Sequence, residues 1–389
     1  GTSPYSRQTH LPARFGADPS KRAAMAWSCG TLVQVLAAAG LALTSLVSGA
    51  RHSARDSSPP ALSLLQQRTT SSRKLNVALV AVVPYGAMNS SSWRDGLAVM
   101  AHSARKMAKK SAHRITLHAI LPDTLPHQEK ERQVLAKLGL EALFVPIPVP
   151  LKQVKTAFAR KELALVLGEM EQLKYYGAAL TDYDRVVILD GDTMWLQPID
   201  ELFTDTSGAK LQGIYDHELD IDGSTFPPLN TGFLVFTPDK RDFDAINGIV
   251  REGDFRDGTG WEGSMTGWTY GTGSQGVLSF YYNQVHPGVP GYNATGPTKG
   301  KDLPGLPFTK QPASSRFRPL DRSVYNVIET GLLKEAIRDK RADASRVKLF
   351  HFTGGCVKPW TCSPPSSSIC EDMTKRWWAL RAELAQRWG

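Results

Sequence analysis

The sequence predicts an α/β fold: a mainly parallel sheet flanked by helices, forming a single domain from residue 75 onward. Two observations support this. After their first residue, 76–83 and 185–189 are continuous apolar runs rich in valine, without the alternation expected of a strand that has one solvent-exposed face. Strand-like and helix-like segments also alternate through the first half of the chain, which is typical of layered α/β proteins.

The elements can be assigned in order from their hydrophobic periodicity. The first half is expected to contain strands at 76–83, 114–121, 142–149 and 185–189, and helices at 93–107, 127–138 and 161–180. The second half is expected to contain strands at 232–237 and 347–352, helices at 242–251 and 275–283, a glycine-rich loop at 253–273 and an irregular stretch at 287–320.

The C-terminal segment carries apolar residues at helical spacing. They are Met373, Trp377, Leu380, Leu384 and Trp388. This pattern predicts a helix with one apolar face, and packing against the core is the favoured role over partner binding.

The first 74 residues differ in composition from the rest. Residues 23–50 contain no charged side chain and are long enough to span a bilayer. With Lys21 and Arg22 before them, they predict a signal anchor, with residues 1–22 as a cytoplasmic tail and 51–74 as a flexible stem. The alternatives are a signal peptide cleaved after residues 48–50, a plastid-directed leader, and a start at Met25 that removes the basic flank. We expect a Golgi or other secretory-pathway membrane protein with a lumenal domain, or a secreted one.

The basic character of the chain is local. Residues 1–74 hold nine basic and two acidic residues, so they carry +7 of the net charge of +9 and the remainder only +2. A nearly neutral body argues against a nucleic-acid partner. The N-glycosylation sequons at Asn89 and Asn293 fit a lumenal location. In an oxidising lumen, two of the three clustered cysteines (Cys356, Cys362 and Cys370) are able to pair.

The sharpest local signal is Asp190-Gly191-Asp192 directly after the buried run 185–189. Ligands of open α/β sheets bind at the carboxyl ends of strands. Two carboxylates so close suit a hard divalent cation, Mg²⁺ or Mn²⁺, which neutralises a diphosphate, and Gly191 lets phosphate and sugar approach the backbone. An ordinary Asp-Gly turn is the competing interpretation of these residues alone.

Further blocks follow in a characteristic order. They are Tyr183 to Thr193, Leu229-Asn230-Thr231-Gly232, Gly273-Ser274-Gln275-Gly276, Leu320 with Tyr325-Asn326, and His351-Phe352-Thr353-Gly354 with Lys358-Pro359-Trp360. Together they resemble the glycogenin-like family 8 glycosyltransferases over roughly residues 75–385. The resemblance implies a GT-A type, Rossmann-like domain and a retaining, Mn²⁺- or Mg²⁺-dependent transferase of the hexosyltransferase kind. It would move a sugar from a UDP-sugar to a glycan or protein acceptor, and a homodimer is compatible with it.

The resemblance also implies a role for each matching residue. Asp190, Asp192 and His351 would bind the metal, and Lys358 and the Gly354 backbone would meet the diphosphate. Asn230 and Gln275 would hold sugar hydroxyls through their amides. The remaining donor contacts would come from Lys174, sixteen residues before Asp190, and from the end of the first strand at Val82, Val83, Tyr85 and Trp93. Taken alone, Lys174 is equally compatible with a surface lysine, and Trp93 is equally compatible with a buried core residue.

This chain departs from the family pattern at three places. Ser274 and Gly271 stand where the family has aspartates, and one extra residue separates Gly354 from Lys358. The altered acids leave the sugar and the acceptor open. They also keep in view a catalytically weak relative that binds nucleotide sugars or glycans. A sugar-nucleotide hydrolase with a similar metal-diphosphate site is a separate alternative.

Overall fold

The computed structural model describes residues 73–83, 90–165, 168–216, 229–256, 260–262, 271, 273–283, 316–329 and 343–388. The predicted tail, anchor and stem up to residue 72 lie outside these ranges. So do Tyr85, Asn89, Asn293 and most of residues 287–320. Within the described ranges, no helix combines the length and apolar character needed to cross a membrane.

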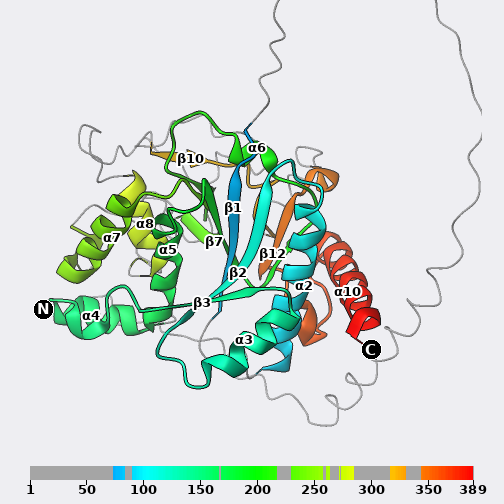
Figure 1. The fold of residues 1–389 in the computed structure, drawn as a ribbon, viewed down its shortest axis with the longest axis horizontal. Coiled ribbons are helices and arrows are strands. Elements are labelled where there is room, and N and C mark those ends of the chain that lie inside the picture. Colours follow the sequence, from blue (N-terminus) through cyan, green and yellow to red (C-terminus); the bar gives the residue numbers. More distant parts are fainter. Residues whose placement is uncertain are drawn as a thin grey trace, which may run out of the picture. The chain divides into compact units, whose positions relative to one another are not determined.

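A seven-stranded sheet lies at the centre of the domain, in the order β10-β6-β7-β4-β1-β2-β3 (Figure 1). Its strands are β1 (Asn76–Val82), β2 (Arg114–Pro122), β3 (Glu141–Val145), β4 (Arg185–Asp190), β6 (Leu211–Tyr215), β7 (Leu229–Phe236) and β10 (Phe317–Pro319). Strands β4, β1, β2 and β3 run parallel, whereas β7 is antiparallel to both of its neighbours. The predicted α/β class with a mainly parallel sheet is confirmed.

Both faces of the sheet are covered, which explains the unbroken apolar run in β1. Val77, Leu79 and Ala81 belong to one buried cluster, and Ala78, Val80 and Val82 belong to the other. Helices α2 (Ser91–Ala108), α3 (Gln128–Lys137) and α10 (Ser368–Trp388) cover the first face. Helices α4 (Ala157–Leu165), α5 (Tyr176–Ala179), α7 (Lys240–Glu252) and α8 (Ser274–Asn283) lie on the opposite face (Figure 1).

Smaller elements complete the domain. A three-stranded sheet contains β11 (Val327–Glu329), β12 (Leu349–Gly354) and β5 (Thr193–Trp195) in the order β11-β12-β5. The glycine-rich segment contributes a short hairpin of β8 (Phe255–Arg256) and β9 (Gly260–Trp261), whose Trp261 is fully buried. The short helix α6 (Asp200–Phe203) follows β5.

The predicted helix at 161–180 is wrong. Helix α4 ends at Leu165, and a 3₁₀-helix (Gly168–Tyr175) and the single turn of α5 follow. Gly168 has φ of +60°, a left-handed conformation that an α-helix cannot contain. The predicted strand at 142–149 is also too long: β3 stops at Val145, because the prolines at 146, 148 and 150 cannot donate to a sheet.

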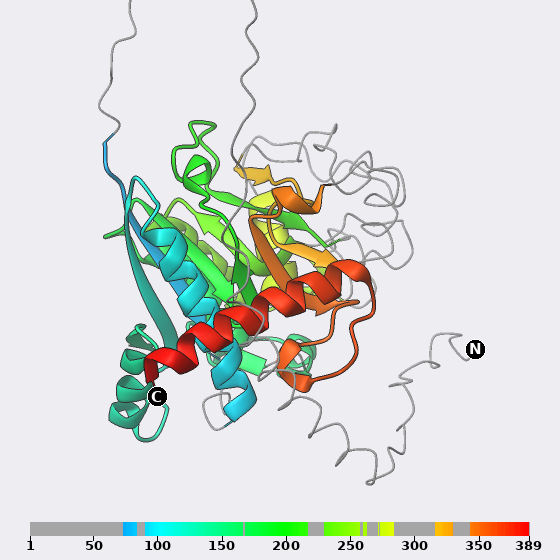
Figure 2. The same cartoon turned by 90° about the vertical axis from the view of Figure 1, so that its right-hand side faces the viewer.

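The C-terminal helix is confirmed, and its apolar face packs on the core. Met373, Trp377 and Leu384 are each 1% exposed, and Leu380 is partly buried. Helix α10 crosses α2 (Figure 2) and is tied to it by Glu383, which bonds His102 at 2.9 Å. Packing against the core, rather than partner binding, is therefore the role of this face.

Candidate active site

Asp190 and Asp192 lie at the carboxyl end of β4, the central strand of the seven-stranded sheet. The register pairs Asp190 with Val82, so the carboxyl ends of β4 and β1 meet at the same edge. Thr193 Oγ1 donates to the Asp190 carbonyl at 2.9 Å and closes the turn between them. Gly191 is buried at this turn, and a Cβ there would lie 3.8 Å from Trp93 and Leu97 of α2.

His351 reaches this turn through the pairing of two short strands. Strand β5, immediately after Asp192, runs antiparallel to β12, and this register places His351 opposite Thr193. The Phe352 N–H donates to the Asp192 carbonyl at 2.9 Å, which fixes the register. As a result, His351 Nε2 lies 3.2 Å from Asp192 Oδ1, although the two residues are far apart in the sequence.

The three predicted metal ligands form one cluster. One potential ligand atom from each of Asp190, Asp192 and His351 lies within 4.8 Å of the others. Two carboxylates and an imidazole are a donor set that suits Mn²⁺, and their spacing allows all three to reach a single ion. Gly232 of β7 makes room for the imidazole, because a Cβ there would lie 2.2 Å from His351 Cε1. The residues present therefore fit a divalent cation.

The two carboxylates differ in their electrostatics. Burial and the repulsion from Asp192 together outweigh the attraction of Lys174 and raise the pKa of Asp190 above its usual value. Burial also acts on Asp192, but His351 and Lys358 overcome it and hold the pKa of Asp192 well below its usual range. Asp192 therefore carries its charge at neutral pH.

Lys174 is buried beside Asp190 and is not the surface lysine that the sequence alone allowed. Its side chain is 5% exposed, and its Nζ lies 3.0 Å from Asp190 Oδ1. It also contacts Glu171 Oε1 at 3.4 Å and Thr231 Oγ1 at 3.2 Å. Burial disfavours the ammonium, but the two carboxylates prevail and raise the pKa of Lys174 above its ordinary value. Contact with the donor stays a prediction for this residue.

Lys358 extends from the segment after β12 to the metal cluster. Its ammonium contacts Asp192 and donates to the Phe352 carbonyl. Gly354 at the end of β12 has φ of +65°, and a Cβ there would lie 2.8 Å from the Glu329 carbonyl. The extra residue between Gly354 and Lys358 thus leaves the lysine in contact with a predicted metal ligand.

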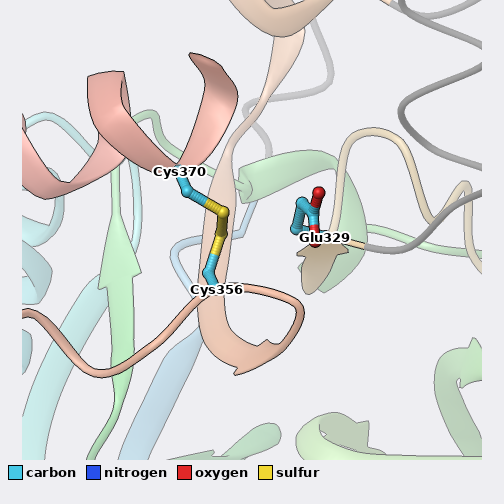
Figure 3. A group of neighbouring side chains, drawn as sticks. All are labelled: Glu329, Cys356 and Cys370. Carbon is cyan, nitrogen blue, oxygen red and sulfur yellow. A yellow bond between two sulfur atoms is a disulfide. The ribbon is translucent and has the colours of Figure 1, made fainter. Parts of the chain in front are cut away.

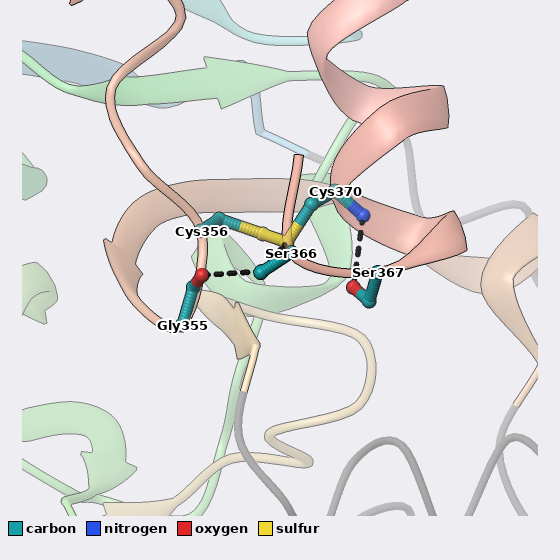
Figure 4. Close-up of a disulfide and its surroundings, with 5 residues drawn as sticks. All are labelled: Gly355, Cys356, Ser366, Ser367 and Cys370. Carbon is teal, nitrogen blue, oxygen red and sulfur yellow. Dashed lines mark hydrogen bonds between the residues drawn. A yellow bond between two sulfur atoms is a disulfide. The ribbon is translucent and has the colours of Figure 1, made fainter. Parts of the chain in front are cut away.

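A disulfide anchors the same segment. Cys356, two residues before Lys358, is bonded to Cys370 in the first turn of α10. Ser366 Oγ donates to the Gly355 carbonyl, and Ser367 Oγ accepts from the Cys370 N–H at 3.4 Å (Figure 4). Of the pairings that the three clustered cysteines allowed, this one forms.

Glu329 lies near this disulfide and groups with Cys356 and Cys370 as a second set of potential ligands (Figure 3). The sulfur atoms that bind metals are thiolates. Because the two sulfur atoms here are joined to each other, the group is not a metal site in this state.

Asn230 is held in place by three hydrogen bonds. Its Nδ2 donates to Asp216 at 2.8 Å, and its Oδ1 accepts from the Gly232 N–H at 3.0 Å and from Asn326 at 2.8 Å. Gln275, in the first turn of α8, is half-buried, and its Nε2 has no hydrogen-bond partner among the described residues. A sugar hydroxyl would suit that amide, so the predicted role of Gln275 has support that Asn230 lacks.

The residues expected to contact the uridine lie at the end of β1, the strand beside β4, and in the segment that follows it. Val82 and Val83 are buried at the end of β1, and Tyr85 lies outside the described residues. Trp93 is half-buried in the first turn of α2, where it meets Gly191 and Trp360, the latter with ring centroids 5.9 Å apart. Trp93 packs against the core and also lies next to the Gly191 turn, and its contact with the uridine stays a prediction.

Glu171 lies beside the predicted site residues, although no motif in the sequence marks it. It lies in the 3₁₀-helix on the same side as Lys174, since residues three apart eclipse each other in this helix type. It accepts a hydrogen bond from Ser274, which is completely buried. The i, i+3 spacing of Glu171 and Lys174 was the available signal, because residues three apart also lie close together on the expected α-helix.

The chain is similar in sequence to one known protein. Over 186 residues, the chain is 26% identical to glycogenin of Cryptococcus neoformans var. grubii. The chain resembles glycogenin. The match covers 47% of this chain and 16% of that protein, so the chain spans only a small part of its relative. No protein-family model matches the sequence.

Solved glycosyltransferases share a weak structural likeness with the chain. The apo form of GlyE from Streptococcus pneumoniae TIGR4 is 13% identical with a TM-score of 0.44, covering 81% of this chain and 63% of that one. The galactosyltransferase LgtC with donor and acceptor sugar analogs is 14% identical with a TM-score of 0.44, covering 79% and 95%. Mouse xyloside xylosyltransferase 1 is 14% identical with a TM-score of 0.37, covering 73% and 98%. At these scores the likeness carries no argument about activity.

Proposed function

We propose that this chain is a retaining glycosyltransferase of GT-A type that uses a UDP-sugar and Mn²⁺ or Mg²⁺. It would transfer a hexosyl or pentosyl group to a glycan or protein acceptor. The observation that carries this proposal is the cluster of Asp190, Asp192 and His351 at the carboxyl end of β4, with Lys358 beside it. The likeness to glycogenin supports the same assignment.

The chain's own residues have distinct tasks in this proposal. Asp190, Asp192 and His351 hold the cation, which when bound neutralises the diphosphate and stabilises it as a leaving group. Lys358 is 29% exposed, so its ammonium is able to turn from Asp192 to an arriving phosphate. There it would stabilise the charge that develops as UDP departs.

No separate base is required for a retaining reaction on one face of the sugar. In that case the departing phosphate oxygen accepts the proton of the acceptor hydroxyl, and the protein contributes positioning and electrostatic stabilisation. The replacement of the family's aspartates by Ser274 and Gly271 is therefore compatible with activity.

The proposed location is the lumen of the secretory pathway. The disulfide between Cys356 and Cys370 supports an oxidising compartment. Attachment to the membrane through residues 23–50, or secretion after cleavage, and homodimer formation belong to the same proposal.

To test the proposal, the protein is incubated with Mn²⁺ and each of a panel of UDP-sugars, with and without purified glycans. UDP release is measured and the sugar product is identified. We expect Mn²⁺-dependent UDP release that an acceptor stimulates and that yields a glycoside. Free sugar with UDP would point to a hydrolase, and binding without release to a catalytically weak relative. Normal transfer by the Asp190→Ala, Asp192→Ala protein with metal chelated would refute the proposal. Asp244→Ala, which removes an exposed carboxylate on α7, is the matched control.

A further inference from the structure

A chain of buried polar contacts leads from the metal cluster to α8. Lys174 Nζ joins Asp190, at 3.0 Å, to Glu171, at 3.4 Å. Glu171 in turn accepts from the Ser274 hydroxyl, which lies 2.9 Å from Thr231 Oγ1. The acid and the metal ligand Asp190 are therefore both within 3.4 Å of the same ammonium nitrogen.

Lys174 has no donor to spare in this arrangement. An ammonium group has three N–H donors, and three acceptor groups surround it: Asp190, Glu171 and Thr231. A sugar hydroxyl would have to displace one of these partners to reach it. Because Lys174 is 5% exposed and paired with two carboxylates, such a displacement is unfavourable.

Glu171, in contrast to Lys174, keeps hydrogen-bonding capacity for a ligand. Its carboxylate has about four acceptor sites, and among the described residues its contacts with Lys174 and Ser274 use only part of them. Its side chain is 12% exposed, so it is held firmly but still reachable. A carboxylate in such a place is well suited to accept hydrogen bonds from vicinal hydroxyls.

The contact with Ser274 indicates where the negative charge of Glu171 lies relative to α8. Since the Ser274 hydroxyl touches Glu171 directly, a carboxylate on either residue would occupy nearly the same space. This chain has a serine at the position before Gln275 and supplies the negative charge from a different element, the 3₁₀-helix that carries Lys174.

We propose that Glu171, fixed by Ser274 and Lys174, binds hydroxyl groups of the sugar carried by the UDP donor and so takes part in selecting that sugar. The inference rests on the proposed function. It assigns the sugar-binding acid to a residue that the sequence pattern does not mark, and it limits Lys174 to orienting Asp190 and Glu171.

The first experiment compares UDP with UDP-sugars. The full chain is titrated with UDP, UDP-glucose, UDP-galactose and UDP-xylose in the presence of Mn²⁺, by calorimetry. We expect Glu171→Gln to leave the affinity for UDP unchanged and to weaken the best UDP-sugar about tenfold or more, as for a lost hydrogen bond to a charged group. Glu169→Gln, in the same 3₁₀-helix but bonded to the Leu151 N–H, should change neither.

The second experiment moves the charge. Ser274→Asp alone places two carboxylates in contact and should weaken sugar binding, since like charges repel. The double variant Glu171→Ser, Ser274→Asp returns one carboxylate to the same place and should recover most of the affinity for the UDP-sugar. If Glu171 only supports Lys174, the affinity for UDP should fall and recover together with the affinity for the UDP-sugar; if it binds the sugar, the affinity for UDP should stay constant throughout.

The outcomes separate this inference from the proposed function. If the wild type shows no Mn²⁺-dependent affinity for UDP or any UDP-sugar, the proposed function fails and the inference fails with it. If the wild type binds and Glu171→Gln weakens UDP and UDP-sugar equally, or the double variant is no better than Glu171→Ser, only the inference is overturned.

Discussion

The substitution Gly232→Ala adds one methyl group beside His351 and so tests whether the position of this ring matters for metal binding. Gly232 lies in β7, where every residue is buried, and the His351 imidazole packs against its backbone. A Cβ at this position would come within 2.2 Å of His351 Cε1 and 2.6 Å of Nδ1. Gly232→Ala therefore forces either the ring or the strand to move, without removing any ligand.

The size of the effect of Gly232→Ala depends on whether strand β7 or the His351 ring moves. Strand β7 is paired on both sides by β4 and β6, so the ring is the softer element. Overpacking of this kind costs about 1–3 kcal/mol of folding stability. Displacing the ring also moves Nε2 from its place beside Asp192, and changes of this sort around metal ligands weaken binding roughly 10–100-fold.

The assay is a pair of measurements on the same protein: thermal unfolding and Mn²⁺ affinity by calorimetry. Gly177→Ala is the control, because its Cβ would lie 2.4 Å from the ring of Phe236, the last residue of β7. Both variants should lose stability, but only Gly232→Ala should lose Mn²⁺ affinity. If Mn²⁺ binding is unchanged in Gly232→Ala, or falls equally in both, then His351 is not a ligand held by this contact.

Three further changes have definite expectations. Asp192→Asn should remove Mn²⁺-dependent UDP release and also lower the melting temperature, because it leaves Lys358 and His351 without their carboxylate partner; retained release would count against the assigned ligands. Cys356→Ser with Cys370→Ser opens a link of sequence separation 14 and should cost about 3 kcal/mol of stability in chemical denaturation; an unchanged midpoint would argue that the bond is dispensable. Asp239→Ala removes the cap of α7 and should cost about 1 kcal/mol at pH 7. Hydrogen bonding to Arg241 holds the pKa of Asp239 below its ordinary 3.8, so this stabilisation is present above that value and fades as the pH falls below it. Acid melting curves that keep the full difference would contradict that sign.

Much of the candidate site could be predicted because short motifs carry it. Asp190-Gly191-Asp192 after a buried run marks a strand end, and His351 and Lys358 come from another recognisable block. The structure brings all four together. Glu171 could not be found in this way, since its role depends on a 3₁₀-helix that begins at a left-handed Gly168 and on a serine far along the chain.

The sequence by itself determined the layered fold, the strand that ends in two carboxylates and the helix that closes the domain. These depend on hydrophobic periodicity and on local residue chemistry, which act over a few neighbouring residues. Only the tertiary structure decided which side chains meet. The pairing of β5 with β12 places His351 beside Asp192, and burial turns Lys174 from a plausible surface residue into the shared partner of Asp190 and Glu171. Such contacts join residues that are distant along the chain, and the free energy of a buried charge depends on partners that only the folded molecule supplies.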